Sequence, residues 1–270
     1  MFTKLLKQDW RARWGVLGVL CLICLSAAVL GGGSMRYLVW ASTQSETMNL
    51  PTVLCVLTMV ASFIAIAVCC VAQLFFQLWR FYKSCFTDEG YLTFTLPVTT
   101  HEILLSSLIN TFLGVLLMVV VACVSLGGLL LLGFSVVEGF WPALWELLPR
   151  LLQDVANSLT GELLGYGLMM LLAGTLGFIC EIILLMLCIT IGAMVAKKHK
   201  LLAAVGAYYG IQVAVSIVEA VFLASQVVRV VGEANIFFRV FGMNSILMLI
   251  LSLLSYFGMY YLTDRKLNLT

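Results

Sequence analysis

The segment from Pro51 to Trp79 contains no charged residue, and neither does the segment from Ile103 to Gly133. A helix needs about 20 residues to cross the roughly 30 Å hydrocarbon layer of a bilayer. Each segment exceeds that length, whereas a soluble helix of similar length would turn a charged face towards water. These two segments therefore predict helices that cross a membrane.

The composition of the whole chain supports the same conclusion. Charged residues make up 10% of the chain and hydrophobic residues 63%, whereas soluble domains carry about 25% charged residues. The formal net charge is only +2, which gives no electrostatic support for a nucleic-acid partner. We therefore expect an all-α integral membrane protein that contacts membrane lipids and binds no nucleic acid.

Six apolar stretches, separated by polar residues, predict six transmembrane helices within a single domain, 1–270. Their approximate ranges are 14–33, 51–79, 103–133, 163–196, 201–228 and 240–262. The second, third and fourth stretches are longer than a bilayer requires. Helices formed by these three must tilt or extend beyond the bilayer.

The basic residues predict the orientation, because cytoplasmic loops carry an excess of Lys and Arg. If both termini are cytoplasmic, only Arg36, Arg150, Arg229 and Arg239 lie on the outer side. The cytoplasmic side then carries the other basic residues: Lys4, Lys7, Arg11, Arg13, Arg80, Lys83, Lys197, Lys198, Lys200, Arg265 and Lys266. We expect a multi-pass protein of the cell (plasma) membrane with cytoplasmic N- and C-termini.

Two segments next to the spans have amphipathic patterns. Residues 2–14 gather apolar side chains near one helical face and basic side chains elsewhere, which is typical of a helix in the membrane interface. Residues 134–161 repeat tryptophan and leucine at helical spacing, which predicts a second interfacial helix, interrupted near Pro149. Alternatively, Trp141 and Trp145 only anchor the ends of the neighbouring spans.

The cysteines and histidines do not form a recognisable site. Most of the nine cysteines lie in apolar stretches, where a thiol behaves as a small apolar side chain. Cys21 and Cys24 have metal-ligand spacing, but no histidine or second cysteine pair accompanies them. No Ser–His–Asp set forms around His101 or His199. We expect this chain to bind no metal and no cofactor, and to have no catalytic residue.

The polar segment 80–102, between the second and third spans, is the most informative part of the chain. Thr99 and Glu102 directly precede an apolar stretch and match a capping box, in which each side chain accepts a hydrogen bond from the other residue's backbone N–H. Before them, the Thr-Asp-Glu sequence at 87–89 predicts the start of a short helix that Pro97 would limit. The aromatic surface of such a helix would contact either lipid or a partner.

The run Asp-Glu-Gly-Tyr-Leu-Thr-Phe-Thr-Leu-Pro-Val at 88–98 resembles the loop between the second and third spans of ABC-type exporter permeases of the type-2 family, in forms common among Firmicutes. The six-span topology and the basic amphipathic N-terminus are also similar to that family. The resemblance implies two kinds of partner, namely a cytoplasmic ATP-binding subunit and a second permease subunit of the same or a related chain.

The same resemblance implies roles for two segments. Residues 2–14 would form an elbow helix along the membrane, and the loop at 80–102 would contain a coupling helix that docks on the ATPase. The docking residues implied in this way are Asp88, Glu89, Gly90, Tyr91, Leu92, Phe94 and Leu96. ATP hydrolysis would drive alternating access and export of a substrate that the sequence leaves open.

The chain lacks the means to hydrolyse ATP by the usual route. No Gly-x-x-x-x-Gly-Lys-Ser/Thr phosphate-binding loop occurs in it. We therefore expect this chain not to be an enzyme. In an exporter of this family, the ATPase would be a separate polypeptide.

Glu181 and Glu219 are the acidic residues deep within the predicted spans. A charge at the bilayer centre costs about 3 kcal/mol or more, so both should face the interior of a helix bundle. Counted from the cytoplasmic ends of their spans, the two lie at similar depths on consecutive antiparallel helices. They could line a translocation path, share a proton or bind a cationic substrate. Alternatively, each is neutral and hydrogen-bonded to a polar neighbour.

Other functions are compatible with parts of this pattern. A proton-coupled secondary transporter that uses Glu181 and Glu219 is the main alternative, although the chain has no evident inverted repeat. An intramembrane enzyme would need a nucleophile, paired acids or metal ligands at membrane depth, and one glutamate per helix does not supply them. A membrane scaffold without transport activity also remains open.

Overall fold

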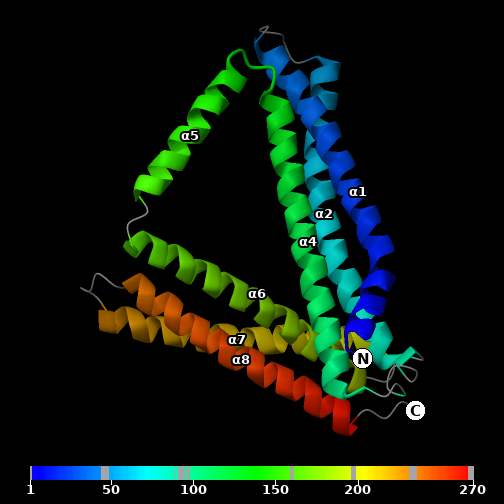
Figure 1. Cartoon of the computed structure of the whole chain (residues 1–270). Coiled ribbons are helices and arrows are strands. Elements are labelled where there is room, and N and C mark those ends of the chain that lie inside the picture. Colours follow the sequence, from blue (N-terminus) through cyan, green and yellow to red (C-terminus); the bar gives the residue numbers. More distant parts are fainter. Residues whose placement is uncertain are drawn as a thin grey trace. The chain divides into compact units, whose positions relative to one another are not determined.

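The computed structural model describes residues 2–43, 49–87, 89–90, 95, 98–158, 161–195, 199–230 and 236–266. These residues form seven α-helices and no strand (Figure 1). The helices are α1 (Phe2–Thr43), α2 (Leu50–Phe86), α4 (Thr100–Phe134), α5 (Phe140–Ser158), α6 (Gly161–Val195), α7 (Lys200–Val230) and α8 (Ile236–Lys266). The predicted all-α class is confirmed.

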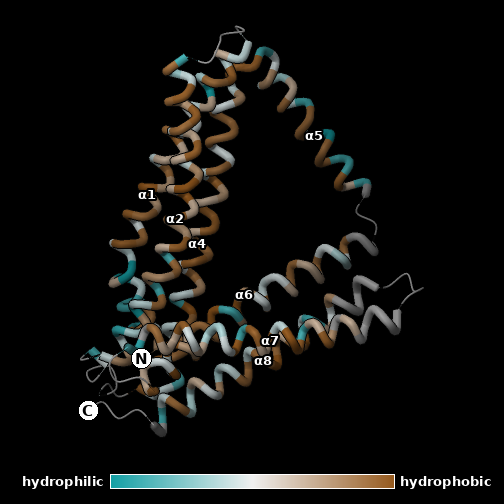
Figure 2. Tube along the Cα trace, turned by 180° about the vertical axis from the view of Figure 1, so that it is seen from behind, coloured by the Kyte–Doolittle hydropathy of each residue, from teal (hydrophilic) through white to brown (hydrophobic). Residues whose placement is uncertain are grey.

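Six of these helices, all except α5, are long and apolar enough to cross a membrane. The prediction of six such helices is therefore confirmed. Figure 2 shows apolar residues along most of α1, α2 and α4, with hydrophilic residues gathered where α1 begins. The six apolar helices indicate a multi-pass membrane protein.

Helix α1 is longer than the first predicted span. Its 42 residues form one helix, which corresponds to about 63 Å at 1.5 Å per residue. Residues 2–14 are the first turns of this helix, and the elbow role that the resemblance implies for them stays a prediction. The helix contains no proline that would end it, and its buried Arg13 is hydrogen-bonded to Gln77 of α2.

Helix α5 is amphipathic and exposed. Pro149 lies inside it, so the predicted interruption at this residue is wrong. A proline removes one backbone hydrogen bond, but the turns on both sides remain helical. Trp145 and Leu152 are exposed, and Arg150 pairs with Glu146 at 3.4 Å on a polar part of the helix. Both interpretations of this segment, as an interfacial helix or as an anchor, are compatible with these facts.

The chain forms two compact units. The N-terminal unit contains residues 7–77 and 113–157, and the C-terminal unit contains residues 1–6, 78–112 and 158–270. Helices α1, α2 and α4 run side by side in the N-terminal unit, and α6, α7 and α8 do so in the C-terminal unit (Figures 1 and 2). A single transmembrane domain stays a prediction.

Small side chains allow the three helices of the N-terminal unit to pack closely. A buried cluster joins Cys24 and Ala27 of α1 to Ile66 and Cys69 of α2 and to Met118 of α4. The cysteines act here as small apolar residues, as the sequence predicted. All nine cysteines lie in the described ranges, and all are free thiols.

A polar group is also buried within this unit. Arg13 of α1 is 1% exposed, and Gln73 and Gln77 of α2 are 0% exposed. Nη1 of Arg13 donates a hydrogen bond of 2.5 Å to Oε1 of Gln77. Gly114 of α4 makes room for these side chains, since a Cβ atom there would lie 2.2 Å from Nε2 of Gln77. Arg13 therefore joins two helices and does not face lipid headgroups as a surface charge.

Candidate functional site

The predicted docking segment follows α2. Of the docking residues, Glu89 and Gly90 lie within the described part of the chain and have helical backbone conformations. The remaining docking residues lie outside it: Asp88, Tyr91, Leu92, Phe94 and Leu96. The complete coupling helix therefore stays a prediction. The two ends of the segment, where it joins α2 and α4, lie within the described residues.

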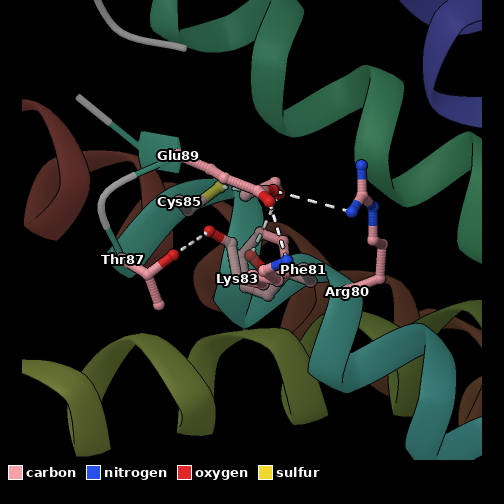
Figure 3. A network of polar contacts seen from close by, with 7 residues as sticks. Arg80, Phe81, Lys83, Cys85, Thr87 and Glu89 are labelled. Carbon is pink, nitrogen blue, oxygen red and sulfur yellow. Dashed lines mark hydrogen bonds and ion pairs between the residues drawn. The ribbon is translucent and has the colours of Figure 1, made fainter. Parts of the chain in front are cut away.

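Glu89 is bound back to the end of α2 (Figure 3). Its Oε1 lies 2.8 Å from Nζ of Lys83, and its Oε2 lies 3.6 Å from a guanidinium nitrogen of Arg80. The hydrogen bond from Lys83 is the main reason that the pKa of the Glu89 carboxyl lies below its usual value; burial opposes this effect, and the charges of Arg80 and Lys83 support it. The side chain is 42% exposed, so solvent screens these pairs. They position the segment more than they stabilise the fold.

Gly90 packs directly against the backbone of α2. A Cβ atom on this residue would lie 2.6 Å from the carbonyl oxygen of Cys85, closer than real Cβ contacts. The Gly90 N–H donates a hydrogen bond of 2.7 Å to the carbonyl oxygen of Thr87. Oγ1 of Thr87 in turn donates one of 2.6 Å to the carbonyl oxygen of Lys83 (Figure 3). The chain therefore turns tightly after α2, and glycine is the residue that fits this approach.

The other end of the segment is fixed by the capping box at the start of α4. The Thr99 N–H donates a hydrogen bond of 3.1 Å to Oε2 of Glu102. The Glu102 N–H in turn lies 3.4 Å from Oγ1 of Thr99 and 3.0 Å from its carbonyl oxygen. The predicted capping box is therefore confirmed.

The start of α4 is also bound to the end of α8. The ring of His101 stacks on Tyr260 with centroids 3.7 Å apart, and Nδ1 of His101 lies 3.2 Å from the hydroxyl of Tyr256. Oγ1 of Thr100 donates a hydrogen bond of 3.1 Å to Asp264. These contacts give His101 a packing role between two helices. The sequence did not indicate this contact, because its partners are more than 150 residues away.

Both ends of the segment meet a buried apolar cluster. The cluster joins α2, α4, α6 and α8 through Phe81, Cys85, Phe86, Ile103, Leu104, Ile182, Met186 and Met259. Phe81, Met186 and Met259 are 0% exposed. Because protein interiors are close-packed, a displacement of the segment's ends must move or deform these four helices.

The two acidic residues within the spans have different surroundings. The hydroxyl of Tyr208 on α7 donates a hydrogen bond of 2.5 Å to Oε1 of Glu181 on α6. Oε1 of Glu219 on α7 is buried and has no hydrogen-bond partner among the described residues. Tyr208 and Glu219 are separated by about 16 Å of helix. The structure therefore pairs Glu181 with Tyr208, and no hydrogen bond joins the two glutamates in the described part of the chain.

Three polar residues of α7 lie on one face of the helix. Tyr208, Gln212 and Glu219 are spaced by four and seven residues, which places them one above another. Oε1 of Gln212, like that of Glu219, is buried without a hydrogen-bond partner among the described residues. Tyr208 was not among the residues predicted from the sequence. The spacing of these three residues is the signal that could have identified it.

The described residues contain no group of three or more His, Cys, Asp or Glu side chains that could hold a metal ion. Comparison of the chain with protein-family models, with curated proteins and with solved structures gives no match. The contacts described above and the resemblance of residues 88–98 are therefore the observations that bear on function.

Proposed function

We propose that this chain is the membrane-spanning subunit of an ATP-binding-cassette exporter, in which a separate cytoplasmic ATPase drives alternating access. The six apolar helices supply a membrane-embedded body, and the sequence has no phosphate-binding loop of its own. In this proposal the termini and residues 80–102 lie on the cytoplasmic side of the plasma membrane. A second permease subunit, of the same or a related chain, completes the transporter.

The observation that carries the proposal is the attachment of the loop at 80–102. Its first part is held to α2 by the ion pairs of Glu89. Its last part is held by the capping box and by the stacking of His101 on Tyr260. A docking element moves the spans only if it is fixed to packed elements that can shift together. The buried cluster of α2, α4, α6 and α8 supplies such a connection.

The described contacts also suggest how the segment divides its tasks. Glu89 and Gly90 are engaged with α2, so we assign them a positioning role. We assign contact with the ATPase to the apolar and aromatic residues that follow, with Tyr91 and Phe94 as the principal anchors. Aromatic side chains often dominate the binding energy of protein interfaces.

Affinity purification in mild detergent, followed by mass spectrometry, tests this proposal. The wild-type chain should retain a stoichiometric protein that carries a phosphate-binding loop. The double variant Tyr91→Ala/Phe94→Ala should bind that protein roughly 30-fold more weakly, as expected for the loss of an interface anchor that contributes about 2 kcal/mol. Trp145→Ala is the matched control, because it removes an exposed aromatic side chain from α5.

Two results would contradict the proposal. A wild-type chain recovered alone, with no ATPase activity stimulated by its addition, would remove the basis for an exporter subunit. Equal retention of the partner by the double variant and by Trp145→Ala would reject the docking assignment.

A proton-coupled secondary transporter is the second candidate. It is favoured by the buried Oε1 of Glu219 that lacks a hydrogen-bond partner among the described residues, because an isolated charged carboxylate is costly in an apolar environment. In proteoliposomes without nucleotide, an imposed pH gradient should then drive proton flux. Glu219→Gln should abolish the flux, whereas Glu102→Gln, at the exposed start of α4, should retain it. Flux that needs ATP would reject this candidate.

A further inference from the structure

A groove runs between α7 and α8 in the C-terminal unit. Both helices pack extensively against α6 but make few contacts with each other. The groove has a volume of about 660 Å³, within the range of ligand sites. Its lining is apolar and includes Gly210, Ala214 and Val218 of α7 and Ile246, Ile250 and Leu254 of α8.

The dimensions of the groove favour a hydrocarbon chain as its occupant. Along α8 the lining residues run from Met243 to Leu254, a rise of about 16 Å. This length and the apolar lining suit one extended acyl chain. No atom lies within 4 Å of a Cβ atom placed on Gly210, so the groove is open at this residue.

Beyond one end of the groove, α7 begins with a basic residue, about 15 Å of helix before the first lining residue, Gly210. Helix α7 begins at Lys200 and α8 ends at Lys266. These two ends lie together, because consecutive helices joined by a short connection run antiparallel. The half-buried Lys200 precedes Ala207 and Ala214 by seven and fourteen residues, which places it on the groove side of α7.

Further basic residues are neighbours of these helix ends in the sequence. Lys197 and Lys198 come just before α7, and Arg265 lies beside Lys266. Clusters of Lys and Arg that flank membrane helices attract anionic headgroups. A basic residue therefore lies beyond one end of an apolar groove, at the height where a lipid headgroup would lie if its acyl chain occupied the groove.

We propose that the groove between α7 and α8 is a binding site for an anionic phospholipid. One acyl chain lies between the helices along Gly210 and Ala214, and the phosphate group is held by Lys200. The occupant comes from the surrounding membrane, because the groove lies between two helices that are apolar enough to cross it. This inference does not depend on the exporter function.

Native mass spectrometry of the full chain in detergent tests the site. The chain is titrated with dioleoyl phosphatidylglycerol and, separately, with dioleoyl phosphatidylcholine, which has the same acyl chains and no net charge. The wild type should bind the anionic lipid several-fold more tightly. Lys200→Gln should reduce that preference, and Lys7→Gln, an exposed lysine of α1, should leave it unchanged.

A second pair of variants tests the position of the acyl chain. Gly210→Leu places a side chain in the groove and should weaken binding of both lipids by roughly tenfold. Removing two methylene groups of the acyl chain from their contact with the groove is enough to cause that loss of affinity. Val213→Phe is the control, since Val213 is 59% exposed and is not part of the groove lining. Gly210→Leu should fold, because leucine is a better helix former than glycine and the space beside Gly210 is open.

Three results would overturn the proposal. The first is equal binding of the two lipids by the wild type, which would remove the headgroup site. The second is a lipid preference in Lys200→Gln equal to that in Lys7→Gln. The third is equal lipid binding by Gly210→Leu and Val213→Phe at unchanged thermal stability, which would place the acyl chain elsewhere on the surface.

Discussion

The carbonyl oxygen of Cys85 lies 2.6 Å from the position that a Cβ atom on Gly90 would occupy. This approach fixes the direction in which the chain leaves α2. Cys85 itself is 0% exposed and belongs to the cluster that joins four helices. The contact between these two residues therefore links the predicted docking segment to the buried apolar cluster of the C-terminal unit.

Replacement of Gly90 tests this link. Gly90→Ala must shift either the segment or the Cys85 carbonyl group, so we expect faster hydrogen exchange over residues 83–90 and several-fold weaker retention of the ATPase subunit. Gly128→Ala is the control, because nothing lies within 4 Å of a Cβ atom at that residue of α4. If the two variants exchange and bind alike, the close approach does not position the segment.

The ion pairs of Glu89 predict a dependence on pH. The folded state lowers the pKa of this carboxyl, mainly through the hydrogen bond from Lys83. The resulting stabilisation is complete when the pH is above the ordinary pKa of glutamate, about 4.3. It is lost as the pH falls through the lower pKa of Glu89 in the folded state. Hydrogen exchange over residues 83–90 should be slower in the wild type than in Glu89→Gln at pH 7 and at pH 5.

This difference should decrease only in more acidic solution, below about pH 4.3. Each pair of measurements is made at one pH, so the intrinsic pH dependence of exchange cancels. A difference that has already vanished at pH 6 would contradict the assigned direction of the pKa change.

Gln77 should contribute measurably to the stability of the N-terminal unit. Gln77→Leu keeps most of the side-chain volume but removes the acceptor of the Arg13 hydrogen bond. We expect the free energy of unfolding to fall by roughly 1–3 kcal/mol, measured by denaturant titration in mixed micelles. Gln8→Leu, an exposed residue of α1, should change it little. Equal stability of the two variants would show that the buried hydrogen bond contributes nothing.

The hydrogen bond between Tyr208 and Glu181 should be important for the pairing of α6 and α7. Tyr208→Phe removes only the hydroxyl, and hydrogen bonds between membrane helices contribute about 0.6 kcal/mol on average. A small decrease in the thermal midpoint is therefore expected, together with altered transport if Glu181 lines the path. Tyr209→Phe, which changes an adjacent exposed tyrosine, should alter neither the thermal midpoint nor transport. Transport unchanged in Tyr208→Phe and in Glu181→Gln would make this pair structural.

The sequence allowed the features that depend on neighbouring residues to be predicted. Apolar length identifies the spans, because the hydrocarbon thickness sets a minimum that each stretch meets by itself. The capping box at Thr99 and Glu102 could be predicted for the same reason, since its two residues lie within one helical turn.

The features that were missed depend on contacts between distant parts of the chain. Arg13 resembled a surface charge, because its acceptor Gln77 lies 64 residues away. Tyr208 is 27 residues from Glu181, so the local pattern could place it on a polar face of its helix but could not show that the two residues pair. Gly90 could have been a flexible turn residue. Only its approach to Cys85 shows that a side chain is excluded at this position.

The placement of the cysteines gives a direct way to establish the sidedness of the protein. Apart from Cys123, they are buried or half-buried, and Cys123 belongs to the apolar helix α4. Maleimides react with the thiolate, which an apolar environment disfavours. A water-soluble maleimide should therefore leave the native chain largely unmodified. Labels introduced by Lys4→Cys or Asp154→Cys would then report which face of a sealed vesicle each residue occupies, without prior removal of the native thiols.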